Sequence, residues 1–260
     1  YMTNPYEDEE YAKKYSGWHN GNHGRYLEKL EKLYKTPYEK EYSEIYNRIY
    51  LLDETHLQHT QYEINLIETL CKNKQSWLDV ACGTGYHLDN VKSDVLKFGV
   101  DRSPDMITYA KENTDSSIEY ICSDINDFAP DITFDLVTFL WMGYVHQPSL
   151  TSVLNTIYAA SEKVSKSGNF LMTFCDPLYI FENSPSKGVF CGRGDINFDG
   201  LIWSYSDEVN EIQYENLIAP NKFRILDILS SNYTDVEEVV YTKANEEYWK
   251  KSAFLFRGKK

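Results

Sequence analysis

The chain has 260 residues, of which 42% are hydrophobic and 25% are charged, so it can bury a core as one large domain with appended elements. Its 26 basic and 40 acidic residues give a formal net charge of -14, which argues against nucleic acid and membranes as partners because a negative surface repels both. No run of about 18 apolar residues is present to span a bilayer.

Residues 1–75 are polar and rich in tyrosine, and their apolar spacing predicts helices over 24–35 and 59–70. The second helix has one apolar face, formed by Tyr62, Leu66, Ile67 and Leu70. We expect this region to be a helical cap rather than an independent domain.

Between residues 76 and 177, short apolar runs alternate with helical patterns. The runs predict strands over 76–81, 95–101, 118–124, 134–140 and 168–177. The patterns between them predict helices over 85–93, 103–113 and 150–165. Strands that alternate with helices form a parallel sheet covered on both faces, so we expect an α/β fold.

After residue 177 the pattern changes to two alternating stretches, 200–209 and 211–220, which are joined across Asn210. They predict an antiparallel pair inserted after the fifth strand. The chain then continues with a predicted helix over 220–232 and predicted strands over 236–242 and 252–259.

A glycine turn joins the first strand to the first helix of this α/β pattern. Gly83 and Gly85 let the backbone approach a ligand closely and aim N–H groups at it. Asp101 closes the second strand, where a carboxylate can accept hydrogen bonds from both hydroxyls of a ribose. Taken alone, these residues fit either a dinucleotide or another adenosine compound.

Three further features separate the two possibilities. Asp79 precedes the glycines, and an acid there suits an amino group better than a pyrophosphate. Leu88 replaces the third glycine of the dinucleotide fingerprint. Asp124 ends the third strand, where it can meet an adenine amino group while Ile125 packs on the ring. A ribose, an adenine and an amino-acid tail together indicate S-adenosyl-L-methionine (SAM).

Four motifs stand in order along residues 76–177: LDVACGTGYHL, GVDRSPDMITYAKEN, CSDINDF and FDLVTFL. This series resembles the class I SAM-dependent methyltransferases. The resemblance implies a Rossmann-like seven-stranded sheet with an antiparallel last strand over 252–259, and SAM at the carboxyl ends of the strands. We therefore expect a helical cap or lid over 1–75 and a methyltransferase domain over 76–260, with an antiparallel insertion at about 181–218.

The resemblance also implies roles for individual residues. Asp79, Gly83 and Gly85 would contact the methionine part, Asp101 the ribose, and Asp124 with Ile125 the adenine. Leu140 and Trp141 would flank the sulfonium. Further contacts with SAM, or with its product S-adenosyl-L-homocysteine (SAH), are expected from Tyr15, Ala81, Arg102 and Met106.

The acceptor is indicated by a narrower similarity. The first two motifs together with MGYVHQPSL are similar to bacterial sugar N,N-dimethyltransferases that act on nucleotide-linked amino sugars, which also carry an antiparallel insertion. Residues 34–58 depart from that pattern as an extra helical segment, and other small-amine methyltransferases share the signature. We expect a small-molecule amine as acceptor, with O-methylation of a natural product or carbohydrate hydroxyl as the alternative.

Methyl transfer needs little beyond the correct orientation of SAM and acceptor, because the donor is activated and a neutral amine is already a nucleophile. A base is still needed to deprotonate an amine, and more urgently a hydroxyl. His146, just past the fourth strand, is the candidate, with Tyr144 nearby. The alternative for His146 is a backbone hydrogen bond.

Aromatic residues provide candidates for a lid and for the acceptor site. Tyr11, Tyr15 and Trp18 are predicted to cover SAM, since aromatic faces favour its sulfonium charge, with ordinary helix packing as the alternative. Trp203 and Tyr205 are candidates for lining the acceptor site, although a half-buried strand would use the same residues.

Metal and partner expectations follow from the remaining residues. The pairs His19/His23 and His56/His59 have metal-ligand spacing, but amine methylation needs no metal and we predict none. The DNA-methylating NPPY motif is replaced by FLWMGY, which favours a small metabolite. Five cysteines without CxxC spacing predict reduced thiols in a cytoplasmic protein. We also expect a monomer or homodimer. A SAM-binding module without turnover and an NAD-dependent oxidoreductase are the alternatives from other classes.

Overall fold

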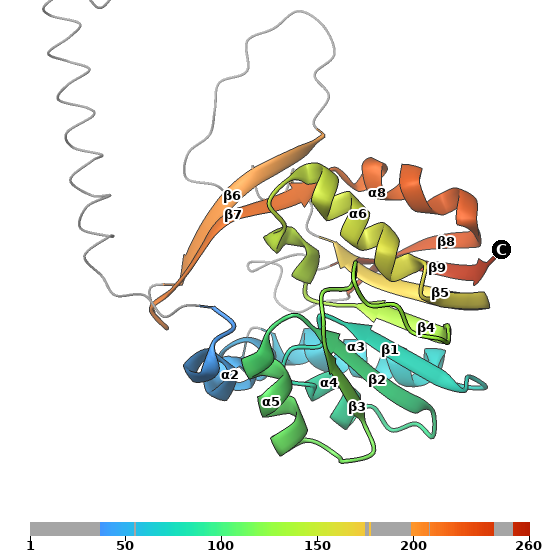
Figure 1. The fold of residues 1–260 in the computed structure, drawn as a ribbon. Helices are drawn as coiled ribbons and strands as arrows, with labels where there is room; N and C mark the ends of the chain where they lie inside the picture. The colour runs from blue at the N-terminus through green and yellow to red at the C-terminus, as the bar shows by residue number, and fades with distance from the viewer. Residues whose placement is uncertain (1–36, 55, 175–176, 178–198, 208, 242–251) are drawn as a thin grey trace, which may run out of the picture.

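The computed structural model describes residues 37–54, 56–174, 177, 199–207, 209–241 and 252–260 (Figure 1). Several expectations lie outside these residues: the helix over 24–35, the beginning of the insertion at 181–198, and the roles of Tyr11, Tyr15, Trp18, His19 and His23.

The described chain is built around a mixed sheet of seven strands in the order β3-β2-β1-β4-β5-β9-β8. The first five are parallel: β1 (Ser76–Val80), β2 (Leu96–Asp101), β3 (Glu119–Cys122), β4 (Phe134–Phe139) and β5 (Val164–Phe174). β9 (Ser252–Lys259) lies antiparallel between β5 and β8 (Tyr233–Val240). The expected α/β sheet with an antiparallel last strand is confirmed.

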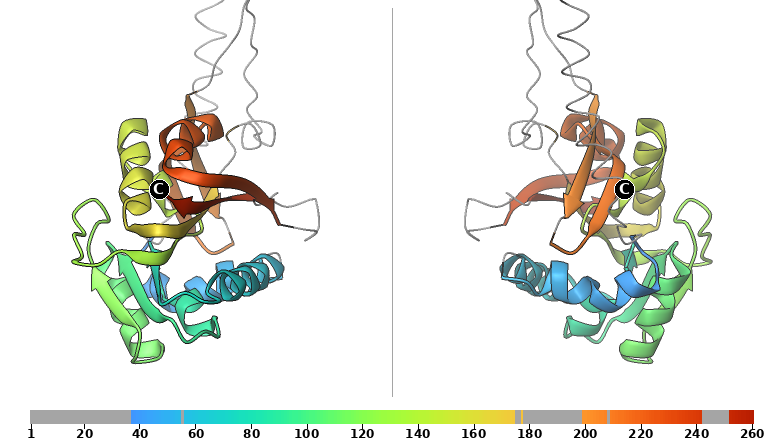
Figure 2. Two further views of the ribbon diagram at one scale, coloured as in Figure 1. Left: turned by 90° about the vertical axis from the view of Figure 1, so that its right-hand side faces the viewer. Right: turned by 90° about the vertical axis from the view of Figure 1, so that its left-hand side faces the viewer.

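Helices cover both faces of the sheet, as Figures 1 and 2 show. Successive strand residues point to opposite faces, so Trp77 joins one core and Leu78 the other. The core with Leu78 is closed by α6 (Leu150–Ser161) and α8 (Lys222–Leu229). The core with Trp77 is closed by α3 (Leu57–Leu70) and α4 (Tyr86–Asn90).

Local sequence explains where several helices begin. α5 (Pro104–Asn113) has proline at its first position, and the hydroxyl of Ser103 accepts the N–H of Met106 as an N-cap. Ser149 and Asn221 cap α6 and α8 in the same way.

The boundary between α6 and β5 differs from the expected one. The helix expected over 150–165 ends at Ser161, and β5 begins at Val164 instead of 168. Ser167 adopts a left-handed φ of 65°, and the register between β4 and β5 shifts between Phe134 and Leu136. The first residues of the strand are irregular, which conceals its period-two pattern in the sequence.

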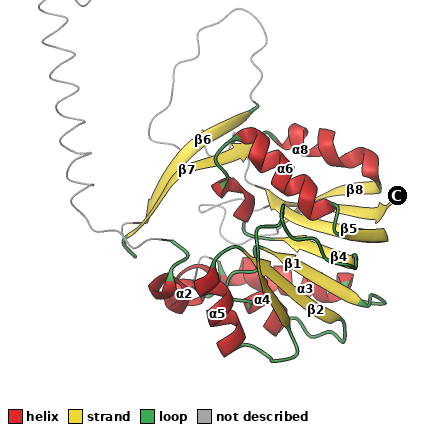
Figure 3. Cartoon of the chain, viewed as in Figure 1, coloured by secondary structure: helices red, strands yellow, loops and turns green. Residues whose placement is uncertain are grey.

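The antiparallel pair after β5 is confirmed as a separate hairpin of β6 (Gly200–Asp207) and β7 (Ile212–Pro220) (Figure 3). β7 contacts α6 and the 3-10 helix Gly143–His146, and buries Ile212 and Leu217 in the core that it shares with α6. The insertion therefore packs beside the segment that follows β4.

The described part of the extra segment 34–58 is helical. α2 (Lys40–Tyr46) continues directly into a π-helix over Asn47–Leu51, and α2 packs against α5. Tyr42, Tyr46 and Tyr50 follow one another at four-residue spacing and their rings are in contact. No helix among the described residues combines the length and the apolar character needed to cross a membrane.

Candidate active site

A cavity of about 760 Å³, counting the space open to solvent, lies at the carboxyl ends of β1, β2, β3 and β4. Such a position is typical of ligand sites in open α/β sheets. Most of the residues singled out from the sequence line it: Ala81, Gly83, Asp101, Arg102, Met106, Asp124, Ile125, Leu140, Trp141 and His146. Asp79, Gly85 and Tyr144 are not among the lining residues.

The two glycines after β1 serve different needs. Gly83 has a left-handed φ of 54°, and a Cβ added to it would meet no atom within 4 Å. It therefore presents bare backbone to the cavity, as close approach of a ligand requires. Gly85 has a φ of 74°, and a Cβ there would lie 2.1 Å from the hydroxyl oxygen of Tyr120. Its role is to let the turn pack against β3, not to line the cavity.

Asp101 is fixed at the end of β2 by backbone hydrogen bonds. Its two carboxylate oxygens accept the N–H of Gly83 at 2.9 Å and the N–H of Ser103 at 2.8 Å. Burial raises the pKa of Asp101, and these hydrogen bonds act in the opposite direction. The carboxylate is thereby held rigidly in the cavity wall, where the sequence predicts ribose recognition.

Asp79 lies behind this wall. It is 4% exposed, and its Oδ1 accepts the hydroxyl of Thr138 at 2.6 Å, while that hydroxyl oxygen accepts the indole N–H of Trp77 at 2.8 Å. Burial raises the pKa of Asp79 to about 6, whereas His87 and the hydrogen bond from Thr138 act to lower it. A buried carboxylate of this kind favours a positively charged ligand group nearby.

The expected adenine side of the cavity is formed by residues after β3. Oδ1 of Asp124 accepts the backbone and side-chain N–H groups of Asn126 at 2.9 and 2.7 Å, which leaves Oδ2 for a ligand. Ile125 is 5% exposed and lines the same cavity. An acceptor oxygen beside an apolar surface is the arrangement that an adenine ring with its amino group requires.

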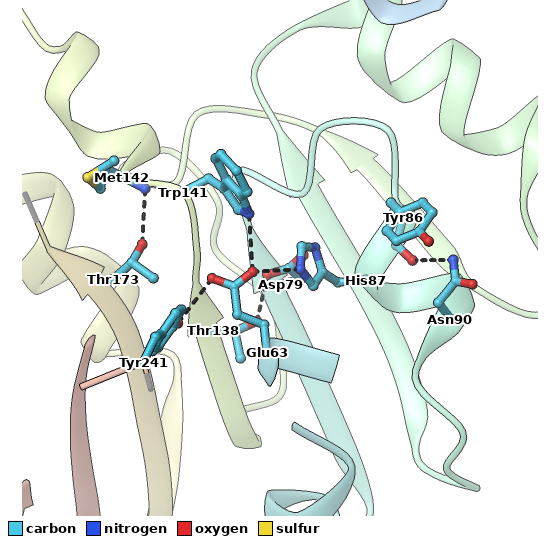
Figure 4. Close-up of polar contacts among 10 residues, drawn as sticks. All are labelled: Glu63, Asp79, Tyr86, His87, Asn90, Thr138, Trp141, Met142, Thr173 and Tyr241. Atoms are coloured by element: carbon cyan, nitrogen blue, oxygen red, sulfur yellow. Dashed lines mark hydrogen bonds and ion pairs between the residues drawn. The ribbon is translucent and has the colours of Figure 1, made fainter. Parts of the chain in front are cut away.

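The turn after β4 forms another wall. Leu140, Trp141 and Gly143 line the cavity. The indole N–H of Trp141 donates to Oε2 of Glu63 at 3.1 Å (Figure 4). Glu63 is fully buried on α3. Glu63 was not singled out from the sequence. The feature that could have indicated it is a carboxylate next to the apolar face of the predicted helix.

His146 forms a pair with a residue that sequence reasoning missed. The hydroxyl of Tyr38 lies 2.7 Å from Nε2 of His146, and both side chains line the cavity. Burial, with a contribution from Arg102, lowers the pKa of His146 to about 4. Burial also raises the pKa of Tyr38, so the phenol keeps its proton and can donate it to Nε2 of the neutral imidazole in its Nδ1–H tautomer.

Tyr144, the second catalytic candidate, lies in the core instead. It is fully buried and packs edge to face against Phe139, with ring centroids 5.5 Å apart. The first turn after Gly143 places Tyr144 and His146 on different sides, so only His146 reaches the cavity.

Tyrosines connect the inserted hairpin to α2. The hydroxyl of Tyr214 on β7 lies 2.7 Å from that of Tyr42 and donates to that of Tyr50 at 3.0 Å. Tyr50 donates in turn to Asp207. Trp203 and Tyr205 are not among the residues that line the cavity, and Tyr205 stacks on Tyr214.

The histidine pair His56/His59 shows no metal-like geometry. His56 Nδ1 lies 2.7 Å from Asp53, and His59 is buried beside Tyr241. Across the ranges that the structure describes, no cluster of three or more His, Cys, Asp and Glu side chains is suited to a metal ion.

Comparison with known proteins finds similarity to methyltransferases. Residues 78–163 match a family described as a methyltransferase domain. The malonyl-[acyl-carrier protein] O-methyltransferase of Acetivibrio thermocellus is 31% identical over 189 residues, which are 62% of this chain and 65% of that relative. The match therefore spans slightly less than two thirds of the relative's length.

Two solved structures share the fold. The sugar N-methyltransferase KedS8 from Streptoalloteichus sp. is 16% identical, with a TM-score of 0.57 over 84% of this chain and 92% of that one. The N-methyltransferase NodS from Bradyrhizobium japonicum, in complex with SAH, is 14% identical, with a TM-score of 0.53 over 76% and 87%. These likenesses show that the chain has the fold of these methyltransferases, and residues 78–163 match the methyltransferase-domain family.

Proposed function

We propose that this chain transfers a methyl group from SAM to an amine of a small molecule such as an amino sugar. KedS8 and NodS, which are named as N-methyltransferases, support an amine, whereas the relative from Acetivibrio is named as an O-methyltransferase. The relatives therefore do not choose between nitrogen and oxygen, and the choice rests on the cavity.

The residues of the cavity fit SAM in chemical character. The bare backbone at Gly83 leaves room for a closely approaching ligand, and Asp101 offers a fixed carboxylate for the ribose hydroxyls. Asp124 and Ile125 suit the adenine, and the carboxylate of Asp79, buried behind the cavity wall, suits the amino group of the methionine part. When bound, SAM would supply an activated methyl group: the acceptor's lone pair attacks the methyl carbon, the bond from that carbon to the sulfonium sulfur breaks, and SAH leaves.

The observation that carries the proposal is the Tyr38–His146 pair in the same cavity as these residues. With a pKa of about 4, His146 is neutral at neutral pH and is too weak a base to deprotonate a hydroxyl. An amine that has already lost its proton to solvent needs no base, and the site has only to hold it in position for attack on the methyl group. The oxygen of Tyr38 can accept an amine N–H while its own hydroxyl proton points at Nε2 of His146, and this contact orients the nitrogen lone pair.

O-methylation is the second candidate because of the relative's name. It would require the Tyr38–His146 pair to take the hydroxyl proton during transfer, with the phenol passing its own proton to Nε2. The net charge of -14 favours a small acceptor over nucleic acid in either case. We also expect a cytoplasmic monomer or homodimer.

The test is a panel of acceptor pairs that share one scaffold and differ only in an amino or a hydroxyl group. Formation of SAH is measured with wild-type protein and with His146→Asn. We expect the amine to be methylated, and its turnover to fall less than about tenfold in the variant because proximity carries the rate. Faster methylation of the hydroxyl partner, with a loss of about 10²-fold or more in His146→Asn, would establish the second candidate instead.

Two controls separate the alternatives from other classes. Stabilisation by NAD and not by SAM in a thermal-shift assay would indicate an oxidoreductase. Binding of SAM without formation of SAH for any acceptor would indicate a binding module without turnover.

A further inference from the structure

The turn after β4 contains backbone strain beside the cavity. Trp141 and Met142 are consecutive residues with left-handed φ values of 51° and 56°, although neither is glycine. This conformation is unfavourable for residues that carry a Cβ, and it persists only where surrounding groups impose it. Trp141 lines the cavity, so whatever imposes the conformation also shapes the site.

Two side chains hold the turn from different elements (Figure 4). Glu63 on α3 accepts the indole N–H of Trp141 at 3.1 Å. Thr173 on β5 accepts the backbone N–H of Met142 with its hydroxyl oxygen at 3.2 Å. Both Glu63 and Thr173 are fully buried, so neither can reorient freely.

Glu63 is itself fixed by residues distant in sequence. Its Oε2 also accepts Nε2–H of His87 at 2.9 Å, and its Oε1 accepts the hydroxyl of Tyr241 at 3.0 Å. The donors come from α4, from the turn after β4 and from the residue that follows β8. A buried carboxylate that is held by several donors is a rigid anchor.

The turn after β4 packs directly against the start of the glycine turn that follows β1. A Cβ added to Gly143 would lie 2.7 Å from the Cβ of Ala81 and 3.2 Å from the ring of Phe139. Because this contact leaves no spare room, a change in the backbone conformation of Trp141 or Met142 would displace the cavity wall that is expected to face SAM.

We propose that Glu63 and Thr173 are positioning residues that hold the Trp141–Met142 turn in the strained form required for donor binding. They act through the turn and are not among the residues that line the cavity. The proposal rests on the proposed function, because it takes this cavity to be the site of SAM.

The first test removes the hydrogen bond from Thr173 to the turn and then relieves the backbone strain at Met142. Thr173→Val keeps the shape of the side chain but leaves the Met142 N–H without its acceptor. We expect SAH to bind about tenfold more weakly, a change of about 1.4 kcal/mol, measured by isothermal titration calorimetry. Adding Met142→Gly should restore affinity to within about threefold of wild type, because glycine adopts the left-handed form freely.

Thr234→Val is the matched control for the first test. The hydroxyl of Thr234, on β8, donates to the backbone carbonyl of Arg257 on β9, and Thr234 does not line the cavity, so loss of this bond should leave SAH affinity unchanged. A purely structural role of Thr173 would predict no rescue by glycine at position 142.

The second test separates hydrogen bonding from charge at Glu63. The amide oxygen of Glu63→Gln can accept from Trp141 and His87, and its NH₂ group can donate to Tyr241. We expect Glu63→Gln to lose less than about threefold in SAH affinity and Glu63→Leu about tenfold, because only leucine removes the oxygen that accepts the indole N–H of Trp141.

The outcomes are distinguishable. Absence of SAH binding by wild-type protein would overturn the proposed function and this proposal together. Normal SAH binding by folded Thr173→Val, failure of rescue by Met142→Gly, or equal loss in both Glu63 variants would overturn this proposal alone.

Discussion

Gly83 and Gly85 should respond differently to substitution by alanine, although they are two residues apart in one turn. Both have left-handed φ values, for which a Cβ costs about 1–2 kcal/mol. At Gly83 nothing else opposes the Cβ, so Gly83→Ala should lose about 1–2 kcal/mol of stability. That Cβ would enter the open space of the cavity, and SAH should bind more than about tenfold more weakly.

At Gly85 the new Cβ would also overlap Tyr120, with 2.1 Å to its hydroxyl oxygen and 2.8 Å to Cζ. The ring of Tyr120 is buried and its hydroxyl accepts that of Thr114, so the ring cannot move away freely. Overpacking adds about 1–3 kcal/mol, which brings the expected loss for Gly85→Ala to about 2–5 kcal/mol.

Thermal unfolding followed by circular dichroism, with calorimetric SAH binding, distinguishes the two glycines. A loss of 1 kcal/mol corresponds to about 2–4 °C in Tm for a chain of this size. The added variant Gly85→Ala/Tyr120→Phe removes the closest contact and should recover part of the stability. Normal SAH binding by Gly83→Ala, or a Tm of Gly85→Ala within about 2 °C of wild type, would refute this reading of the turn.

Two further predictions concern Asp79 and the tyrosine contacts. Burial raises the pKa of Asp79 to about 6 and we propose that its carboxylate attracts the amino group of SAH, so SAH affinity should be full only well above pH 6 and fall by up to about tenfold per pH unit well below it; an unchanged profile in Asp79→Asn would contradict this role. Tyr214→Phe should cost about 1–3 kcal/mol in denaturant unfolding, because Tyr42 and Tyr50 lose a buried partner, whereas Tyr205→Phe, at a residue 45% exposed, should stay within about 0.5 kcal/mol. Equal losses in the two variants would assign the effect to the hairpin as a whole.

Features encoded by local sequence were predictable. The order of strands and helices follows from periodicity, and the carboxyl ends of neighbouring parallel strands must meet at one edge. For that reason Gly83, Asp101 and Asp124 could be assigned to one site, and the structure places all three around one cavity.

Features that depend on long-range packing were not predictable. Tyr38 meets His146 across 108 positions, and Glu63 meets Tyr241 across 178. Tyr144 and His146 are neighbours in sequence, yet the 3-10 helix buries one and exposes the other to the cavity. The role of Gly85 depends on Tyr120, a side chain from another strand. No pattern within a single segment contains these partners.

The central claim is methyl transfer from SAM to a nitrogen atom, and the most direct measurement uses SAM with a deuterated methyl group. The paired amine and hydroxyl acceptors are incubated with the protein, and products are analysed by mass spectrometry with SAH quantified in parallel. We predict that the labelled methyl appears on the amine and that SAH forms in equal amount. Label found only on oxygen, or no SAH above the acceptor-free background despite SAM binding, would contradict the account.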